Sequence, residues 1–401
     1  MSREATRTTA GPYNESVLRP TTDARTPETE VQTVIERAMV VLGTRPEAIK
    51  TAPVVHALRA RGVGTTVVST GQHREMLAPM LELFGIEPDV DLDLQHPDQT
   101  AAEVVAGVLR GLPPVLAEHR PQAVLVQGDT ATAFAAGFAA FLAGCDVGHV
   151  EAGLRTDDPR RPFPEEMNRR LITRLARWHF APTARAAAAL GAEGVPDTAI
   201  HTTGNTVVDA LHWLRDERRD RIEADLARDL DGIDLEGRRL VAVTGHRRES
   251  FGEPMRRVCS ALRRIADAHD DVTIVFPVHL NPRVQEAVRA VLSGHPRIHL
   301  LPPVGYPTMI GLLERAVAVV TDSGGIQEEA PGLGTPVLVT REVTERPEGV
   351  EAGFATLVGT DDDAIVRGFE AIGRRPAPAS ENPYGDGRAA ARIVGVLGDV
   401  G

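Results

Sequence analysis

The sequence of 401 residues is poor in cysteine and in aromatic side chains. Its two cysteines, Cys145 and Cys259, lie far apart, so neither a disulfide framework nor a cysteine-based zinc site is expected. Aromatic residues make up 4% of the chain, and the cores should therefore consist of alanine, valine and leucine. No run of about 18 apolar residues could span a membrane, and the N-terminus has no signal-peptide core. We therefore expect a cytoplasmic protein without a membrane partner.

Basic residues are in the minority, with 44 Lys and Arg against 56 Asp and Glu and a formal net charge of -12. This balance argues against a nucleic-acid partner, which would need a basic face, although a local basic pocket for an anion stays open. The H-x-E at His149–Glu151 has no P-C-x-x-C after it, H-E-x-x-H does not occur, and the first strand-to-helix turn lacks G-x-G-x-x-G. We expect no metal and no NAD.

Residues 1–35 are rich in Thr, Arg, Glu and Pro without hydrophobic periodicity, which is typical of a flexible N-terminal extension. From Ala38 onward, continuous apolar runs alternate with helical stretches, which predicts buried parallel strands in βαβ units. Two such series occur, so we predict an α/β protein with two Rossmann-like domains, residues 36–204 and 205–383, and a cleft between them. Ligands of open α/β sheets bind at the carboxyl ends of the strands, so the chemistry should lie there.

Three carboxylates follow the apolar runs of the first series. Asp129 opens a helix, where capping is the common role, and Glu151 comes directly after the run VGHV. Pro162 and Pro164 place Glu165 at the start of the next helix. Carboxylates from adjacent strand ends could converge, and such a cluster can contain one raised and one ordinary pKa, which proton transfer requires.

The first strand-to-helix turn contains two cations, Arg45 and Lys50, around a helix that starts at Pro46. A helix N-terminus already favours anions, so two cations at this place suggest an anionic ligand. A surface salt bridge between Arg45 and Glu47 is the alternative.

The second series also offers cations at a strand end. His246 is followed by Arg247 and Arg248, and three such residues facing a cleft suit contact with phosphate. A lone histidine is more often structural, so this interpretation depends on the neighbouring arginines.

A glycine turn follows a later strand of the second series. Ser323, Gly324 and Gly325 precede a helix whose free N–H groups could meet phosphate oxygens. Glu328 and Glu329 follow one turn later, and one of these glutamates could bind ribose hydroxyls, while Arg346 offers another cation. Together they suggest a sugar-nucleotide site.

Ten motifs occur in order between about residues 38 and 360: GTRPEAIK, TGQHREML, QGDT, GHVEAGLRT, PFPEEMNR, TGNTVVDAL, HRRESFG, PVHLNP, TDSGGIQEEAP and TERPE. Together they resemble the non-hydrolysing UDP-N-acetylglucosamine 2-epimerases, over nearly all of the chain outside the N-terminal extension. The resemblance implies a glycosyltransferase-B arrangement with the active site in the interdomain cleft. It also implies that the last helix, within residues 384–401, packs back on the first domain.

The resemblance implies reversible C2 epimerisation of UDP-GlcNAc to UDP-ManNAc without a cofactor or metal, through elimination of UDP to 2-acetamidoglucal and its re-addition. The implied catalytic residues are Asp129, Glu151, Glu165 and His246. The implied contacts with the UDP-sugar are Arg45, Lys50, Arg155, Arg247, Ser323, Gly324, Gly325, Glu329 and Arg346. A homodimer is the implied assembly.

Two departures from the family pattern stand out. Gly305 and Met309 replace residues that help to frame the uracil in many members. An allosteric UDP-GlcNAc site would use residues matching Gln72, His73, Arg247 and His279. However, Glu75 and Asp98 stand where some activated members have Gln and Arg, so activation stays open.

Three alternatives remain on the sequence: a glycosyltransferase on the same fold, a hydrolysing epimerase that releases ManNAc and UDP, and a non-catalytic sensor of UDP-sugars. A glycosyltransferase would not need three converging carboxylates, and a sensor would need only the contacts to UDP.

Overall fold

The computed structural model describes residues 34–72, 74–96, 98–247, 251–372 and 381–398. Of the expected N-terminal extension, only Val34 and Ile35 fall in these ranges. No helix in the described ranges is long and apolar enough to cross a membrane.

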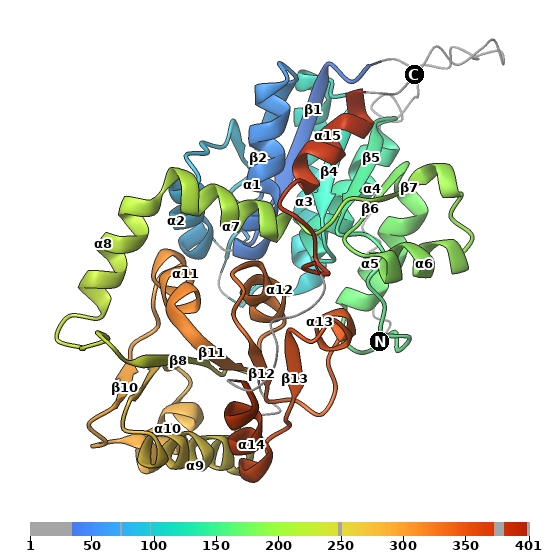
Figure 1. Cartoon of the computed structure of the whole chain (residues 1–401). Coiled ribbons are helices and arrows are strands. Elements are labelled where there is room, and N and C mark those ends of the chain that lie inside the picture. The colour runs from blue at the N-terminus through green and yellow to red at the C-terminus, as the bar shows by residue number, and fades with distance from the viewer. Residues whose placement is uncertain (1–33, 73, 97, 248–250, 373–380, 399–401) are drawn as a thin grey trace, which may run out of the picture.

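The described residues form two parallel sheets, of seven and six strands (Figure 1). The first has the order β3-β2-β1-β4-β5-β6-β7, so the strand order reverses between β1 and β4. Its strands are β1 (Arg37–Leu42), β2 (Gly64–Ser69), β3 (Val90–Asp91), β4 (Ala123–Gln127), β5 (Asp146–Val150), β6 (Trp178–Ala181) and β7 (Ile200–Thr202). The point of reversal is where an open α/β sheet binds its ligand.

The second sheet repeats this plan in the order β10-β9-β8-β11-β12-β13, with its reversal between β8 and β11. Its strands are β8 (Arg239–Thr244), β9 (Val272–Pro277), β10 (Ile298–Leu301), β11 (Ala316–Thr321), β12 (Val337–Val339) and β13 (Ala355–Leu357). The two sheets confirm the prediction of an α/β protein with two Rossmann-like domains.

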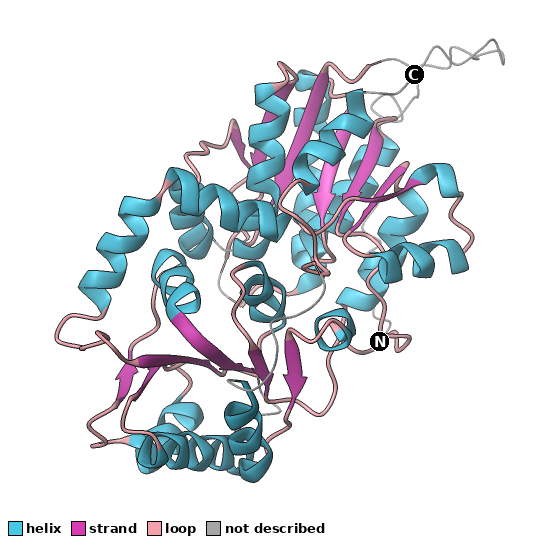
Figure 2. Cartoon of the chain, in the orientation of Figure 1, coloured by secondary structure: helices cyan, strands magenta, loops and turns pink. Residues whose placement is uncertain are grey.

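Helices cover both faces of each sheet, which explains why the strands are continuous apolar runs (Figure 2). The helices of the first domain are α1 (Arg45–Ala60), α2 (Arg74–Leu83), α3 (Ala101–His119), α4 (Ala131–Leu142), α5 (Glu165–Leu175), α6 (Ala184–Ala192) and the short 3-10 turn Asp197–Ala199. Those of the second are α8 (Arg219–Asp229), α9 (Glu253–Ala268), α10 (Pro282–Leu292), α11 (Tyr306–Arg315), α12 (Gly324–Gly332), α13 (Pro347–Glu351) and α14 (Asp362–Ile372).

Two further helices lie where the chain passes between the domains. Helix α7 (Thr206–Glu217) packs against α1, and α15 (Ala389–Gly398) packs against both α1 and α7. The buried carboxylate of Asp209 accepts hydrogen bonds from the N–H groups of Ala389 (3.1 Å) and Ala390 (2.8 Å). A carboxylate at these free N–H groups fixes the start of α15.

A buried lysine joins the two domains. Lys50 in α1 forms an ion pair with Glu151, which follows β5. It forms a second ion pair with Glu328 in α12, 3.0 Å from Nζ to Oε2. The exposed fractions of these side chains are 12%, 7% and 2%. Burial alone would lower the pKa of Lys50, but the two carboxylates outweigh it and raise the pKa above its usual value. The lysine is therefore charged and compensated from both sides.

Replacing Lys50 with Met should destabilise the protein by about 3–5 kcal/mol, because buried carboxylates lose their partner cation. The measurement is the free energy of unfolding in urea. Arg185→Gln is the matched control: Arg185 also reaches the second domain, at Glu351, but its side chain is 54% exposed. It should cost about 1 kcal/mol or less. Equal, small losses in both variants would contradict the role of burial.

Two buried histidines should make the free energy of unfolding sensitive to acid. His149 in β5 and His179 in β6 are direct neighbours across the strand pair. Burial lowers the pKa of His149 to about 3 and that of His179 to about 4. The unfolded chain takes up these protons below about pH 6.5, whereas the folded protein does not. The stability that depends on these two histidines is therefore fully present above pH 6.5 and is lost as the pH drops towards 4. At pH 5 the loss in free energy of unfolding is about 2 kcal/mol per histidine.

The measurement is the urea midpoint at pH 7 and pH 5. His149→Gln should lose less stability between these two pH values than the wild type. His279→Gln, at an exposed position, should keep the wild-type loss. An unchanged loss in His149→Gln would contradict the prediction.

Candidate active site

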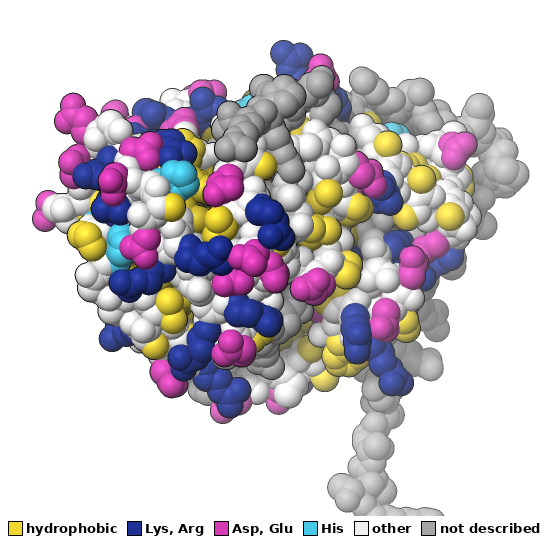
Figure 3. Space-filling model, turned by 60° about the horizontal axis from the view of Figure 1, so that its bottom comes forward, with side chains coloured by type: hydrophobic (Ala, Val, Ile, Leu, Met, Phe, Trp, Pro, Cys, Tyr) yellow, Lys and Arg dark blue, Asp and Glu magenta, His cyan; other side chains and the backbone are white. Residues whose placement is uncertain are grey.

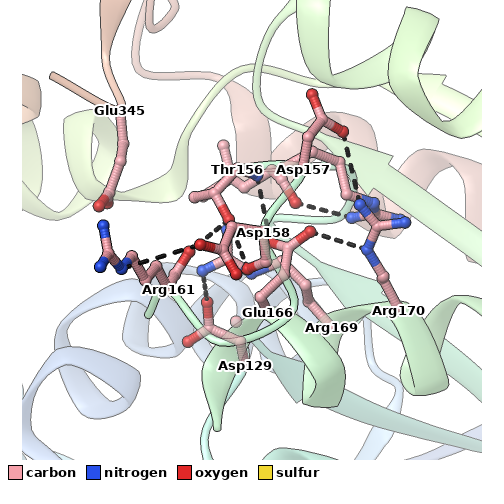
Figure 4. A network of polar contacts seen from close by, with 12 residues as sticks. Asp129, Thr156, Asp157, Asp158, Arg161, Glu166, Arg169, Arg170 and Glu345 are labelled. Carbon is pink, nitrogen blue, oxygen red and sulfur yellow. Dashed lines mark hydrogen bonds and ion pairs between the residues drawn. The ribbon is translucent and has the colours of Figure 1, made fainter. Parts of the chain in front are cut away.

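Asp129 lies at the carboxyl end of β4 and is not the cap of the following helix. Thr130 caps α4, since its hydroxyl accepts a hydrogen bond from the N–H of Ala133 at 2.9 Å. The Asp129 carboxylate instead pairs with Arg169 of α5, 2.6 Å from Oδ2 to Nη2 (Figure 4).

The Asp129 side chain keeps 25% of its surface exposed. Burial of the rest raises the pKa of Asp129 to about 6, while Arg169 acts in the opposite direction. Glu151 and Glu165 both lie near enough to raise the pKa further. The structure therefore brings the three predicted carboxylates together.

Glu151 occupies a strained position at the end of β5 and is held by three side chains. Its φ of 64° is in the left-handed region, which non-glycine residues seldom adopt. Its carboxylate accepts hydrogen bonds from Gln127, from Lys50 and from Nδ2 of Asn205, the last at 3.0 Å. These three donors fix the orientation of the carboxylate.

Glu165 and its neighbour Glu166 differ in their surroundings, although both start α5. Glu166 is fully buried and pairs with Arg169 at 3.5 Å and Arg170 at 2.8 Å, so it holds the loop before the helix (Figure 4). The Oε2 atom of Glu165 is buried and has no hydrogen-bond partner among the described residues. Glu165 thus has an acceptor to offer to a ligand.

At the start of α1, Glu47 caps the helix and does not form the salt bridge to Arg45 that the sequence left as an alternative. Glu47 is buried, and its carboxylate accepts hydrogen bonds from the N–H groups of Gly43 (2.9 Å) and Thr44 (2.7 Å) in a capping box. It forms no surface salt bridge among the described residues. Arg45 is exposed and lies near enough to the second domain to lower the pKa values of His246 and Glu329.

Asp322, which the sequence analysis missed, anchors the turn that carries His246. Its fully buried carboxylate accepts hydrogen bonds from the N–H groups of His246 and Arg247, each at 3.0 Å. The imidazole Nδ1 of His246 lies 3.3 Å from Oδ1 of Asp322. Burial lowers the pKa of His246, and Asp322 acts against it. The contact favours a proton on Nδ1 and leaves Nε2 for other partners.

Two arginines meet over the N-terminus of α12. Ser323 caps this helix. A Cβ added to Gly324 would lie 3.5 Å from the guanidinium carbon of Arg346 and 3.7 Å from Nη2 of Arg247. Glycine thus leaves room beside both guanidinium groups. Free N–H groups, the helix dipole and two cations form a cradle suited to a phosphate.

The acidic pair of α12 also divides into two environments. Glu328 pairs with Lys50 at 3.0 Å and with Arg346 at 2.8 Å. Glu329 accepts a hydrogen bond from the hydroxyl of Tyr306 at 3.3 Å. Burial, reinforced by Glu328, raises the pKa of Glu329 to about 7. Glu329 can therefore act as acceptor or donor towards a hydroxyl near neutral pH.

The structure does not bring every predicted residue to the cluster. Arg155 binds Glu193 at 2.7 Å and Thr173 at 3.0 Å, away from the three carboxylates. Gln72 accepts a hydrogen bond from Thr132 at 2.8 Å, and the ring of His279 lies 6.4 Å from that of His246. His73 lies outside the described residues. Two positions depart from the family pattern. Gly305 is the N-cap residue of α11, and Met309 is partly buried against the hydrophobic core of the second domain.

Several polar partners were missed although each lies in a quoted motif. Gln127 precedes Asp129 in QGDT, Asn205 lies in TGNTVVDAL, and Asp322 lies in TDSGG. Their signal was a polar side chain at the end of a buried strand, or just beyond it. Their targets come from other strands or from the other domain, so the sequence could not identify them.

Two cavities are lined by residues outside the carboxylate cluster. A cavity of about 600 Å³ lies beside Gly204 and Gly385, and one of about 470 Å³ lies between Arg155 and Glu348. Neither is lined by the three carboxylates. The described residues contain no group of His, Cys, Asp and Glu that could hold a metal ion. On the face shown in Figure 3, acidic and basic side chains are interspersed without a large basic patch.

The chain matches known proteins over most of its length. The family described as UDP-N-acetylglucosamine 2-epimerase matches residues 56–398. A UDP-N-acetylglucosamine 2-epimerase of Escherichia coli is 47% identical over 374 residues, which cover 90% of this chain and 98% of the relative. The UDP-GlcNAc 2-epimerase structure from Neisseria meningitidis, bound to UDP-GlcNAc, is similar with a TM-score of 0.81 at 40% identity, covering 90% of this chain and 99% of its own.

A more distant structure agrees. The UDP-GlcNAc 2-epimerase from Methanocaldococcus jannaschii, in complex with UDP-GlcNAc and UDP, has a TM-score of 0.71 at 31% identity and covers 90% of this chain and 99% of its own. The two Rossmann-like domains thus adopt the glycosyltransferase-B arrangement that the resemblance implied. With this fold and a family match that spans most of the sequence, the chain belongs to the UDP-N-acetylglucosamine 2-epimerase family.

Proposed function

We propose that the protein is a non-hydrolysing epimerase that interconverts UDP-GlcNAc and UDP-ManNAc by inversion at C2 of the sugar. The observation that carries the proposal is the pairing of two groups across the domains. Asp129, Glu151 and Glu165 converge on one side, and the cations over the N-terminus of α12 form a phosphate cradle on the other. The Neisseria relative is bound to UDP-GlcNAc, which supports this substrate.

The carboxylate side supplies what the elimination step requires. As the C1–O bond breaks, its electron pair leaves with UDP and positive charge develops at C1, which acidifies the proton on C2. A carboxylate takes that proton, and a double bond forms between C1 and C2. Asp129, with a pKa of about 6, can hold or release a proton near neutral pH. Glu151, held in place by its three donors, stabilises the positive charge.

The cation side explains why UDP would be retained rather than released. Arg247, Arg346 and the N–H groups of α12 surround the position for a diphosphate, and Arg45 approaches from the first domain. Retained UDP can then attack C1 again after a proton has been delivered to the other face of C2. The position of His246, fixed by Asp322, suits contact with the same phosphates.

The test is proton NMR of UDP-GlcNAc in deuterated water with the purified protein and no acceptor. We expect UDP-ManNAc to form and the proton on C2 to exchange in both epimers, without accumulation of free UDP. Accumulation of UDP in step with turnover would indicate a hydrolysing epimerase. Absence of both products would leave the family assignment for the fold alone.

Asp129→Asn should lower kcat by about 10²–10⁴-fold, because the amide cannot transfer the proton. Affinity for UDP, measured by calorimetry, should stay at the wild-type value, since the phosphate cradle lies in the second domain. Asp158→Asn, at a partly exposed aspartate of the loop before α5, serves as the control and should keep full activity. Wild-type turnover in Asp129→Asn would contradict the assignment.

We also propose that the protein forms a homodimer through an apolar patch on α4 and α5. The patch consists of Phe134, Phe138, Phe141, Phe163, Met167 and Leu171. Spacings of three and four residues place these side chains in one stripe along α4 and another along α5 and the turn before it, and the two helices pack together. Phe141 is 54% exposed and Phe163 is 74% exposed. The patch holds four of the chain's 10 phenylalanines, and such an exposed surface marks an interface.

The double variant Phe141→Glu, Leu171→Glu should sediment as a monomer, whereas the wild type should sediment at twice the mass of the chain. In an isologous interface each substituted position occurs twice, so the contact between the copies would have to bury four unpaired charges, which opposes association. Val343→Glu, which changes an apolar residue 72% exposed in the second domain, is the control and should stay dimeric. A dimeric double variant, or a monomeric wild type, would contradict the proposal.

A further inference from the structure

Within the described residues, the chain crosses between the domains at two places, and these two crossings touch each other. The first crossing follows Gly204, and the second runs through Tyr384 and Gly385. A Cβ added to Gly204 would lie 3.3 Å from the Cα of Gly385, and one added to Gly385 would lie 3.1 Å from the Cα of Gly204. Both glycines have positive φ, 91° and 116°. The two backbones meet at a distance that only glycine permits.

Asn205 joins these crossings and also contacts the carboxylate cluster. Its backbone N–H donates to the carbonyl of Tyr384 at 2.7 Å. Its side-chain Nδ2 donates to Oε1 of Glu151 at 3.0 Å. The residue is only 3% exposed, so water cannot replace these contacts easily. One residue thus connects the contact point of the two crossings with Glu151.

The orientation of the Asn205 amide follows from its second role. Asn205 caps α7, and its Oδ1 accepts a hydrogen bond from the N–H of Val207 at 3.1 Å. Since an N–H group can only donate, this contact assigns the oxygen. The NH₂ group must then face Glu151. The helix cap therefore selects the orientation in which the amide donates to the carboxylate.

Tyr384, whose carbonyl accepts the hydrogen bond from Asn205, also contacts the backbone beside the phosphate cradle. The hydroxyl of Tyr384 accepts a hydrogen bond from the N–H of Gly349 at 3.1 Å and donates to the carbonyl of Arg346 at 3.4 Å. Arg346 is one of the two arginines over α12. A continuous path of hydrogen bonds therefore runs from Glu151 through Asn205 and Tyr384 to the backbone of Arg346.

We propose that Asn205 is a positioning residue for the epimerase reaction, which fixes Glu151 and ties its orientation to the contact between the two crossings. The proposal rests on the proposed function. Gly204 and Gly385 meet directly beside Asn205. A change in this contact would move the donor that holds Glu151, so Glu151 is correctly placed only when the crossings are in the observed contact.

The test separates the helix cap from the contact with Glu151 by three substitutions. Asn205→Ser and Asn205→Asp keep an oxygen acceptor for the N–H of Val207, because Ser and Asp cap helices as well as Asn does. Ser is too short to reach Glu151 from this position, and an ionised Asp has no hydrogen to donate to it. Asn205→Ala loses both the cap and the donor. The readouts are kcat and KM for UDP-GlcNAc epimerisation, and the thermal midpoint of unfolding from pH 5 to pH 8.

We expect Asn205→Ser to unfold near the wild-type midpoint and to lose about 10- to 100-fold in kcat with little change in KM, since misplacement of a catalytic group affects the transition state most. Asn205→Asp places a second carboxylate beside Glu151. Its midpoint should lie below that of the wild type at pH 8, and the difference between the two proteins should shrink towards pH 5, where the pair shares a proton. Asn205→Ala should be both less stable and less active.

Wild-type kcat in Asn205→Ser and Asn205→Asp would overturn the proposal and leave Asn205 as a helix cap. A midpoint of Asn205→Asp that follows the wild type at every pH would overturn it as well, because the side chain would then not face Glu151. This second readout does not depend on turnover. A wild-type protein that does not epimerise UDP-GlcNAc would instead refute the proposed function, and the positioning role with it.

Discussion

The buried ion pairs of Lys50 are the interaction on which the arrangement of the two domains depends. The lysine lies between Glu151 of the first domain and Glu328 of the second, and its pairs connect the two domains through buried side chains. A charge in such a place is stable only when partners surround it, because the protein interior solvates ions poorly. The pairing therefore requires both domains to present their carboxylates at the same point.

Poor solvation in the interior also makes the pKa values of the acidic groups in the site differ from one another. Glu328 lies between Lys50 and Arg346, which outweigh its burial and lower its pKa. Glu166 forms ion pairs with Arg169 and Arg170. Asp129 and Glu329 have less compensation, and burial raises their pKa values to about 6 and about 7. One cluster thus contains both fixed charges and groups that can exchange protons near neutral pH, which is the combination that acid–base chemistry needs.

Much of the fold was predictable because its signals are local. Continuous apolar runs such as AMVVL and AVLVQ become strands covered on both faces, and each ends in polar residues at the edge where α/β proteins bind ligands. The positions of Asp129 and Glu151 follow from this rule alone. The partners do not: Asn205 is 54 residues from Glu151, and Asp322 is 76 residues from His246.

The sequence by itself determined the class of fold, the strand ends that carry chemistry and, through ten ordered motifs, the family. The tertiary structure decided which charged and polar side chains have a partner of opposite charge or a hydrogen-bond partner. It placed Thr130 rather than Asp129 at the helix cap, gave the carboxylate of Glu47 to its own helix and that of Glu193 to Arg155, and set Asn205 beside Glu151. The physical reason is that periodicity is a property of neighbouring residues, whereas charge compensation depends on distances between segments that only folding brings together.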